Sequence, residues 1–204
     1  TPPVVHHIYE TIDDLAEAGA PAVPNLLKSG LTPLALSVQR GMQPKIQALG
    51  EDYKIVCARG PFTIASHLLP LTELLVGVKV EPEAIRALLC VTTQVCKQWL
   101  TLQLDNVKNA KGVLVLDDVC GFLSHDDFAE FAEPCFAEIF NAFPGLLHLF
   151  HNDTDNDVCY SFLDRIGVDA VNPTYLKDGA HIRTLLGNRV AIIGNIPPMS
   201  LAQD

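Results

Sequence analysis

From residue 54 onward, short and continuously apolar runs alternate with longer segments that have a helical period. The clearest run is 112–116, which is apolar throughout and is followed by two aspartates. Strands of this kind are typical of a parallel sheet that is covered on both faces, and their alternation with helices is typical of β/α units. The pattern predicts an α/β fold with about five parallel strands. The other expected strands are 54–58, 146–150, 168–171 and 190–193.

The segments between these runs carry apolar side chains at three- and four-residue steps, as core-facing helices do. Two such segments are 83–104, a long helix, and 178–186, a short one closed by Gly187. Capping-box pairs predict where three other helices begin, namely at Thr11 with Asp14, Ser124 with Asp127, and Thr154 with Asp157. We expect the second of these helices to kink at Pro134 and the third to end at Gly167.

The composition of the chain argues against nucleic acid and membranes as partners. The chain has 14 Lys+Arg against 24 Asp+Glu, a net charge of −10, which is a poor match for nucleic acid or an anionic membrane surface. No apolar run is long enough to span a membrane, and the start of the chain lacks the pattern of a secretory signal. The six cysteines are scattered without a C-x-x-C pair, which favours reduced thiols. We expect a cytoplasmic protein that binds neither nucleic acid nor membrane.

Polar side chains follow strand after strand at the carboxyl end, namely Asp117 and Asp118, His151 and Asp153, Asn172, and Asn195. In parallel β/α folds these ends converge on the mouth where ligands bind, so the residues form one candidate site. The alternative is that Asp and Asn simply terminate strands and cap the next helices.

His151 and Asp153 are the sharpest local feature. Side chains at i and i+2 of an extended strand point the same way, so the imidazole and the carboxylate could bind one metal ion or transfer protons as a pair. Asp117 and Asp118 are adjacent and face opposite ways, so only one is expected to line the mouth. Cys120 is expected to be a buried small side chain rather than a ligand or nucleophile.

Several motifs resemble, in order and approximate spacing, those of the uroporphyrinogen decarboxylase superfamily. They are Gly60-Pro61-Phe62-Thr63-Ile64-Ala65-Ser66, the segment 116–124 with Phe128 and Pro134, His151, Gly167-Val168-Asp169, and Gly194-Asn195-Ile196-Pro197-Pro198. The resemblance covers residues 54–198 and implies a (β/α)8 TIM barrel with its site at the strand carboxyl ends. Because 204 residues is short of the roughly 250 of a closed barrel, only part of the barrel is expected in this chain. Residues 1–53 would form an irregular helical N-terminal segment, and residues 54–204 the barrel portion of a single domain.

The resemblance implies one of two chemistries. Family decarboxylases remove acetate carboxyl groups from a tetrapyrrole without a cofactor, whereas corrinoid-dependent methyltransferases move a methyl group between a small substrate and a cobalamin protein, usually with zinc. The tyrosine that the decarboxylases carry after the first motif is matched here by His67, and their arginine-rich N-terminal motif is not found. These departures favour the methyltransferase branch.

The methyltransferase pattern has a His-x-Cys zinc pair where this chain has His151-Asn152-Asp153. A carboxylate in place of the thiolate makes a harder site, which suits methoxy or methylamine substrates better than thiols. The resemblance therefore implies that His151 and Asp153 are metal ligands or acid/base groups, that Asp118 is an acid/base or orienting group, and that a third metal ligand lies beyond residue 204. The substrate-binding residues that it implies are Phe62, His67, Asp117, Asn172 and Asn195.

The sequence is compatible with three functions. The first is methyl transfer between a small methoxy, methylamine or thiol substrate and a corrinoid protein, assisted by zinc or an acid at the barrel mouth. The second is decarboxylation of uroporphyrinogen in heme (porphyrin) biosynthesis, and the third is a non-catalytic barrel that only binds its ligand. A parallel sheet without its remaining strands exposes edges and apolar faces, so we also expect a homo-oligomer, or further barrel segments supplied by a longer protein or by another chain.

Overall fold

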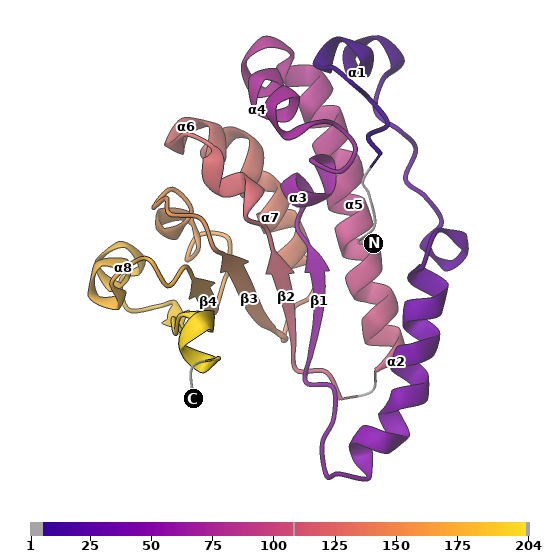
Figure 1. Ribbon diagram of the computed structural model, residues 1–204, viewed down its shortest axis with the longest axis vertical. Coiled ribbons are helices and arrows are strands. Elements are labelled where there is room, and N and C mark those ends of the chain that lie inside the picture. The colour runs from indigo at the N-terminus through magenta and orange to yellow at the C-terminus, as the bar shows by residue number, and fades with distance from the viewer. Residues whose placement is uncertain (1–5, 108, 203–204) are drawn as a thin grey trace.

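The computed structural model of the chain describes residues 6–107 and 109–202, and the first residues of the predicted N-terminal segment lie outside this range (Figure 1). Its helices are α1 (Ile12–Ala18), α2 (Thr32–Gln47), α3 (Pro61–Ala65), α4 (Leu71–Val80), α5 (Pro82–Asn106), α6 (His125–Asp127), α7 (Glu133–Asn141) and α8 (Gly179–Leu186). Its strands are β1 (Ile55–Arg59), β2 (Gly112–Leu116), β3 (Leu147–Asn152), β4 (Ala170–Pro173) and β5 (Ala191–Ile192). Short 3-10 turns lie at η1 (Leu26–Lys28), η2 (Val119–Phe122), η4 (Tyr160–Phe162) and η5 (Pro198–Leu201).

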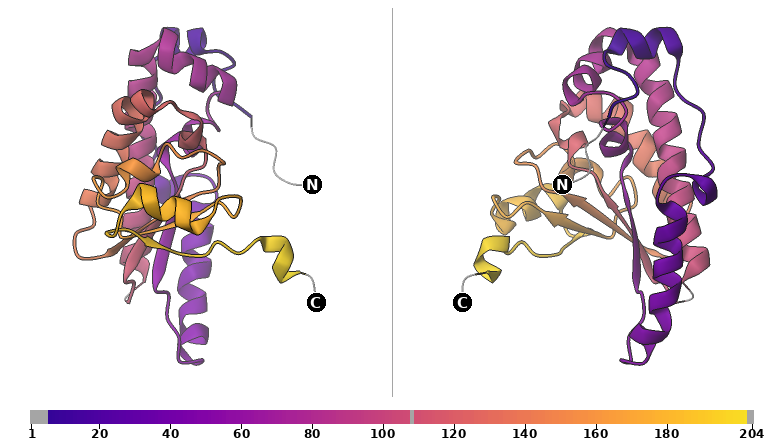
Figure 2. Two further views of the ribbon diagram at one scale, coloured as in Figure 1. Left: turned by 90° about the vertical axis from the view of Figure 1, so that its left-hand side faces the viewer. Right: turned by 45° about the vertical axis from the view of Figure 1, so that its right-hand side comes forward.

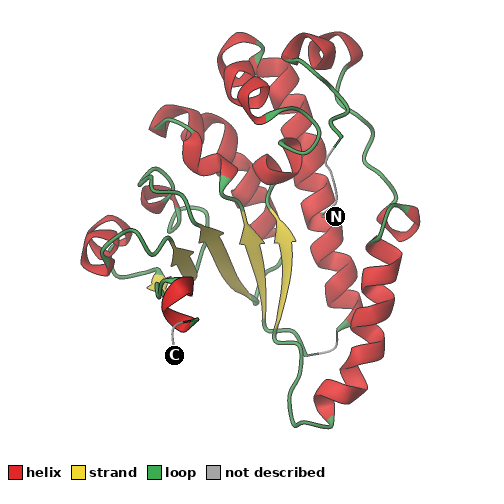
Figure 3. Cartoon of the chain, viewed as in Figure 1, coloured by secondary structure: helices red, strands yellow, loops and turns green. Residues whose placement is uncertain are grey.

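The five strands form one parallel sheet in the order β1-β2-β3-β4-β5, which confirms the predicted α/β fold. Each strand pairs with its successor in the chain, whereas a doubly wound sheet would reverse direction at a switch point. Sequential parallel pairing is the arrangement of a β/α barrel. The described strands therefore form part of a TIM barrel, and Figure 3 shows them as a row with loops at their carboxyl ends.

The two faces of the sheet differ in burial. One face carries the buried core residues of the strands, which are Val56, Ala58, Val113, Val115, Phe150 and Val171. Helix α5 contacts β1 on this side and α7 packs against α5. On the other face Cys57, Arg59 and Leu147 are exposed and Leu114 and Leu149 are half-buried. The expectation that both faces are covered is thus wrong within the described residues, because the second face is the interior of a barrel that these five strands do not close.

One predicted capping box is complete, and a second forms only its side-chain half. The Thr11 hydroxyl accepts a hydrogen bond from the Asp14 amide, and the Asp14 carboxylate accepts one from the Thr11 amide. Helix α1 begins at Ile12, directly after Thr11. The Ser124 hydroxyl likewise accepts from the Asp127 amide at 3.2 Å at the start of α6. The predicted kink is a π-helical turn, η3 (Phe128–Ala132), immediately before Pro134 in the first turn of α7.

The helix predicted from Thr154 to Gly167 is wrong, since only the 3-10 turn η4 forms there. Both of its predicted capping residues are used elsewhere. The Thr154 amide and hydroxyl donate to the Asn152 side-chain oxygen, and the Asp157 carboxylate pairs with Lys177 and His181 at 3.2 and 2.8 Å. Tertiary contacts hold this segment as a loop beside the carboxyl end of β3.

Figure 2 shows the chain after β5 leaving the sheet toward η5.

All six cysteines are free in the structure. Three of them are buried, namely Cys96, Cys120 and Cys159, whereas Cys57 and Cys90 are exposed. Burial raises the pKa of the Cys120 thiol well above its ordinary value, which agrees with its predicted role as a small core side chain. No helix in the described residues is both long and apolar enough to cross a membrane.

Candidate functional site

A cavity of about 140 Å³ lies at the carboxyl ends of β3, β4 and β5. It is lined by His151, Asp153, Asn172, Pro173, Tyr175, Asn195, Ile196 and Pro198. The structure therefore brings together four of the residues singled out from the sequence, although they come from three different strand ends. This follows from the parallel pairing, which places His151 level with Asn172 on the next strand.

The turn after β5 closes one side of the cavity. The Asn195 amide group donates to the carbonyl oxygens of Thr174 and Lys177, both at 2.8 Å, and so ties this turn to the loop after β4. Pro173 lines the cavity from the end of β4 and Tyr175 from the loop that follows, and the sequence analysis missed both because no pattern marks them. Ile196 and Pro198 belong to the quoted Gly-Asn-Ile-Pro-Pro motif, which was the available signal for this side of the cavity.

His151 is held from two sides. Its Nδ1 atom lies 2.7 Å from the Asn172 side-chain oxygen, and its Nε2 atom lies 3.8 Å from Asp118 Oδ1. Asp118 is in turn positioned by the Asp153 backbone amide, which donates to the same Oδ1 at 2.7 Å. Asp118 thus lies next to the imidazole edge, and this arrangement can stabilise a proton on Nε2 when the ring is charged.

Asp117 faces the opposite side of the sheet from Asp118, as the strand alternation predicts. Its side chain is fully buried and accepts hydrogen bonds from the amides of Phe62, Thr63 and Cys120 and from the Thr63 hydroxyl. Burial raises the pKa of Asp117 to about 6, although these hydrogen bonds favour the charged form. Asp117 therefore holds the first turn of α3 against β2.

The close approach of Asp117 accounts for the glycine of the first motif. A Cβ atom at Gly60 would lie 2.6 Å from the Cβ atom of Asp117, a distance at which one of the two residues must move. Phe62 is fully buried in the core and His67 is exposed beyond α3. Phe62, His67 and Asp117 are not among the residues that line the cavity, and their proposed contact with substrate stays a prediction.

The donor groups do not complete a metal site. Among the residues that the structure describes, no group of three or more His, Cys, Asp or Glu side chains is placed to hold a metal ion. His151 and Asp118 approach each other, but Asp118 Oδ1 already accepts from the Asp153 amide. The described residues therefore supply at most part of the ligand set that the resemblance implies for zinc, whose third ligand is expected beyond residue 204, and zinc binding stays a prediction.

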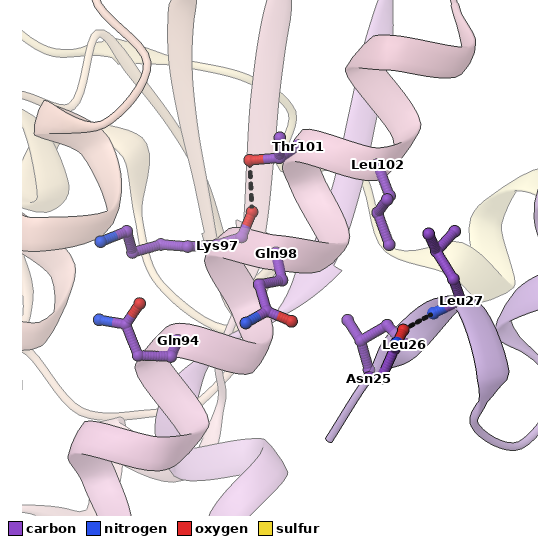
Figure 4. Close-up of a pocket in the computed structure, with 8 residues that line it drawn as sticks. All are labelled: Asn25, Leu26, Leu27, Gln94, Lys97, Gln98, Thr101 and Leu102. Carbon is purple, nitrogen blue, oxygen red and sulfur yellow. Dashed lines mark hydrogen bonds between the residues drawn. The ribbon is translucent and has the colours of Figure 1, made fainter. Parts of the chain in front are cut away.

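A larger cavity, of about 360 Å³, lies away from the strand ends, between η1 and α5 (Figure 4). Two of its polar side chains, Lys97 and Gln94, are already paired with the Glu138 carboxylate, at 2.8 and 2.6 Å. The small cavity beside His151 is therefore the stronger candidate site, because titratable groups converge there at the strand ends.

The chain is similar to one protein family and to two curated proteins. A family described as Uroporphyrinogen decarboxylase (URO-D) matches residues 1–204. Two curated proteins named uroporphyrinogen decarboxylase are similar to it, from Chlorobium luteolum at 29% identity over 125 residues and from Chlorobium phaeovibrioides at 30% over 129 residues. Each match includes 59% of this chain and 35% of the relative, so the chain spans about a third of the length of these relatives.

A solved structure of a methyltransferase from Methanosarcina mazei has a similar fold, with a TM-score of 0.77 and 18% sequence identity. The match covers 93% of this chain and 55% of that protein. This likeness supports the partial-barrel fold.

Proposed function

The chain belongs to the uroporphyrinogen decarboxylase family, whose members are enzymes, and we propose that it serves methyl transfer between a small methylated substrate and a corrinoid protein. The observation that carries the proposal is the lining of the cavity at the ends of β3 to β5. The described lining contains one imidazole, His151, and one carboxylate, Asp153, but no lysine or arginine, and Asp118 approaches His151 from outside the lining. A small neutral or cationic methyl donor fits this lining better than a tetrapyrrole with several carboxylates.

The chemistry requires a proton at the departing atom. When a methyl group leaves oxygen or nitrogen, the bonding electron pair stays on that atom, and protonation makes the atom a much better leaving group. A reduced corrinoid on the partner protein would supply the electron pair that receives the methyl group. His151 donates the proton from Nε2, and Asp118 at 3.8 Å stabilises the charged imidazolium before transfer.

Zinc has no step in this proposal, since the described donor set does not hold it. Asp153 contributes through its backbone amide, which orients Asp118, and through its exposed carboxylate at the cavity rim. A methoxy or methylamine donor is favoured over a thiol, because proton donation assists oxygen and nitrogen leaving groups most.

A second candidate function is decarboxylation of uroporphyrinogen, favoured by the names of the curated relatives. That reaction needs cations for the substrate's carboxylates. Arg59 is exposed at the end of β1 and could serve, whereas Lys177 beside the cavity is paired with Asp155 and Asp157 at 3.1 and 3.2 Å. The fewer cations at the described site make this function the weaker proposal.

The test compares His151→Gln with His125→Gln, a matched control on α6 whose side chain is 67% exposed and outside the cavity. Methyl transfer from methoxy and methylamine donors to free cob(I)alamin is followed by absorption. We expect His151→Gln to lower kcat by about 10²- to 10⁴-fold and His125→Gln to leave it unchanged. Equal rates for the two variants would refute the role of His151, and consumption of uroporphyrinogen with no cobalt methylation would favour the second function.

A further inference from the structure

The Asn172 side chain lies between the imidazole of His151 and the backbone of Ile193, the residue that follows β5. It is the register partner of His151, so their side chains project from the same face of neighbouring strands. Its Nδ2 group donates to the Ile193 carbonyl oxygen at 2.7 Å, and its Oδ1 atom lies 2.7 Å from His151 Nδ1. Both polar ends of this amide are therefore occupied by protein groups.

The Ile193 carbonyl decides which way the amide is oriented. A carbonyl oxygen only accepts, so the NH₂ end of Asn172 must face Ile193 and the oxygen must face His151. That oxygen in turn only accepts, so the group on His151 Nδ1 must be N–H. A neutral imidazole carries one proton, which leaves a lone pair on Nε2, the atom nearest to Asp118.

We propose that Asn172 is a positioning residue that keeps the proton of neutral His151 on Nδ1 and directs the exchangeable Nε2 position toward Asp118 and the cavity. The substrate-binding role expected for Asn172 from the sequence stays a prediction beside this one. The importance of Asn172 for turnover rests on the proposed function, because His151 can give up its Nε2 proton to a leaving group only if Nδ1 keeps its own.

The backbone around Asn172 supports the assignment. The Ile193 amide donates to the Val171 carbonyl at 2.8 Å, which fixes the carbonyl that orients Asn172. The next residue, Gly194, has φ +95°, and a Cβ atom there would lie 3.0 Å from Asn172 Nδ2. The turn therefore leaves just enough room for the amide in this orientation.

The test reads the tautomer directly, by long-range ¹H–¹⁵N NMR of the ¹⁵N-histidine-labelled chain at about pH 9, where an ordinary imidazole is neutral. The His151 signals are assigned by their loss in His151→Gln. We expect a protonated Nδ1 and an unprotonated Nε2 in the wild-type chain. Asn172→Leu removes the acceptor and should move the ring toward Nε2–H, whereas Asn172→Asp keeps an acceptor and should retain Nδ1–H.

Asn195→Ala is the matched control, since Asn195 lies in the same cavity but bonds only to backbone carbonyls of the β4–α8 loop in the described contacts. It should leave the His151 signals unchanged. An Nε2–H tautomer in the wild-type chain would overturn the proposal, and so would an unchanged tautomer in Asn172→Leu. The wild-type spectrum decides the question even if Asn172→Leu does not fold.

Kinetics separate this inference from the proposed function. A positioning residue lowers kcat and leaves KM nearly unchanged, whereas a substrate-binding residue raises KM. We expect Asn172→Leu to reduce kcat for methyl transfer by about 10- to 100-fold, the usual effect of losing a group that orients a histidine. A raised KM with unchanged kcat would contradict the positioning role. If no methyl transfer occurs but the tautomer is as stated, the proposed function fails and the structural role of Asn172 stands.

Discussion

Asp117 and Asp118 are neighbours in the chain and point to opposite sides of the sheet, Asp117 fully buried and Asp118 beside His151. The alternation of side chains along a strand predicts this separation, and the two aspartates therefore have different roles. Asp117 holds the turn that begins α3, while Asp118 stands beside His151. The strand alternation alone could not say which aspartate faces the site, because that depends on which face of the sheet the helices cover.

Asp117 gives the chain a specific pH dependence. Its pKa in the folded chain is about 6, above the ordinary value of 3.8, so the folded state binds this proton more tightly than the unfolded state does. The stabilisation is fully present below about pH 4 and is lost as the pH rises to about 6, on the order of 3 kcal/mol of unfolding free energy. Urea unfolding of wild type, Asp117→Asn and the exposed Asp126→Asn measures it. Only Asp117→Asn should lose this contribution, and equal pH profiles for all three chains would contradict the assignment.

Glycine substitutions test the same contact by sterics alone. Gly60→Ala places a methyl group against Asp117 and should lower the unfolding free energy by about 1–3 kcal/mol. Gly41 lies within α2 with nothing within 4 Å of an added Cβ, so Gly41→Ala should instead raise it by about 0.5–1 kcal/mol. Thermal unfolding of both variants gives the comparison, and a Gly60→Ala chain as stable as wild type would show that the turn has more room than the structure gives it.

At the scale of elements, the strands were predictable because each is a short apolar run that a buried parallel strand requires. The sequence places all five, and it also predicts the caps of α1 and α6. The helix expected from Thr154 was wrong because Asn152, Lys177 and His181 take the groups that would have capped it. Local patterns predict an element only where no distant residue competes for its end groups.

The cap of α6 gives a test at this scale. Ser124 caps the helix and also donates to the Asp127 carboxylate, which pairs with Lys79 at 2.6 Å. Ser124→Ala should lower the unfolding free energy by about 0.5–2 kcal/mol. Thr101→Ala is the control, since the Thr101 hydroxyl bonds only to a carbonyl one turn earlier in α5, and it should change the free energy by less than about 0.5 kcal/mol. Chemical denaturation distinguishes the two variants, and equal losses would argue against the cap.

At the scale of the whole molecule, two apolar surfaces lack a covering layer among the described residues. One is the open sheet face, with Leu147 52% exposed. The other is a stripe that begins at the N-cap residue Leu31 and continues along α2 with Leu34, Val38 and Met42. Surfaces of this kind associate in water. The length of the chain suggested a partial barrel, but the position of the uncovered face could be found only from the strand register and the helix packing.

We therefore predict that the isolated chain self-associates and binds a hydrophobic dye such as ANS. Leu147→Lys places a charge on the open sheet face and should reduce both self-association and dye binding. Lys111→Gln is the control, since Lys111 is exposed directly before β2, and it should change neither property. Light scattering after size exclusion reports the mass. A monodisperse monomer near 22.2 kDa that binds no dye would contradict the open face.

The central claim is that this site transfers methyl groups. Its most direct measurement is the absorption spectrum of cob(I)alamin incubated with the wild-type chain and a methoxy or methylamine donor, set against the same mixture without protein. We predict that methylcobalamin accumulates only with the chain and the donor present. Unchanged cob(I)alamin with every donor, together with decarboxylation of uroporphyrinogen by the same preparation, would contradict the claim.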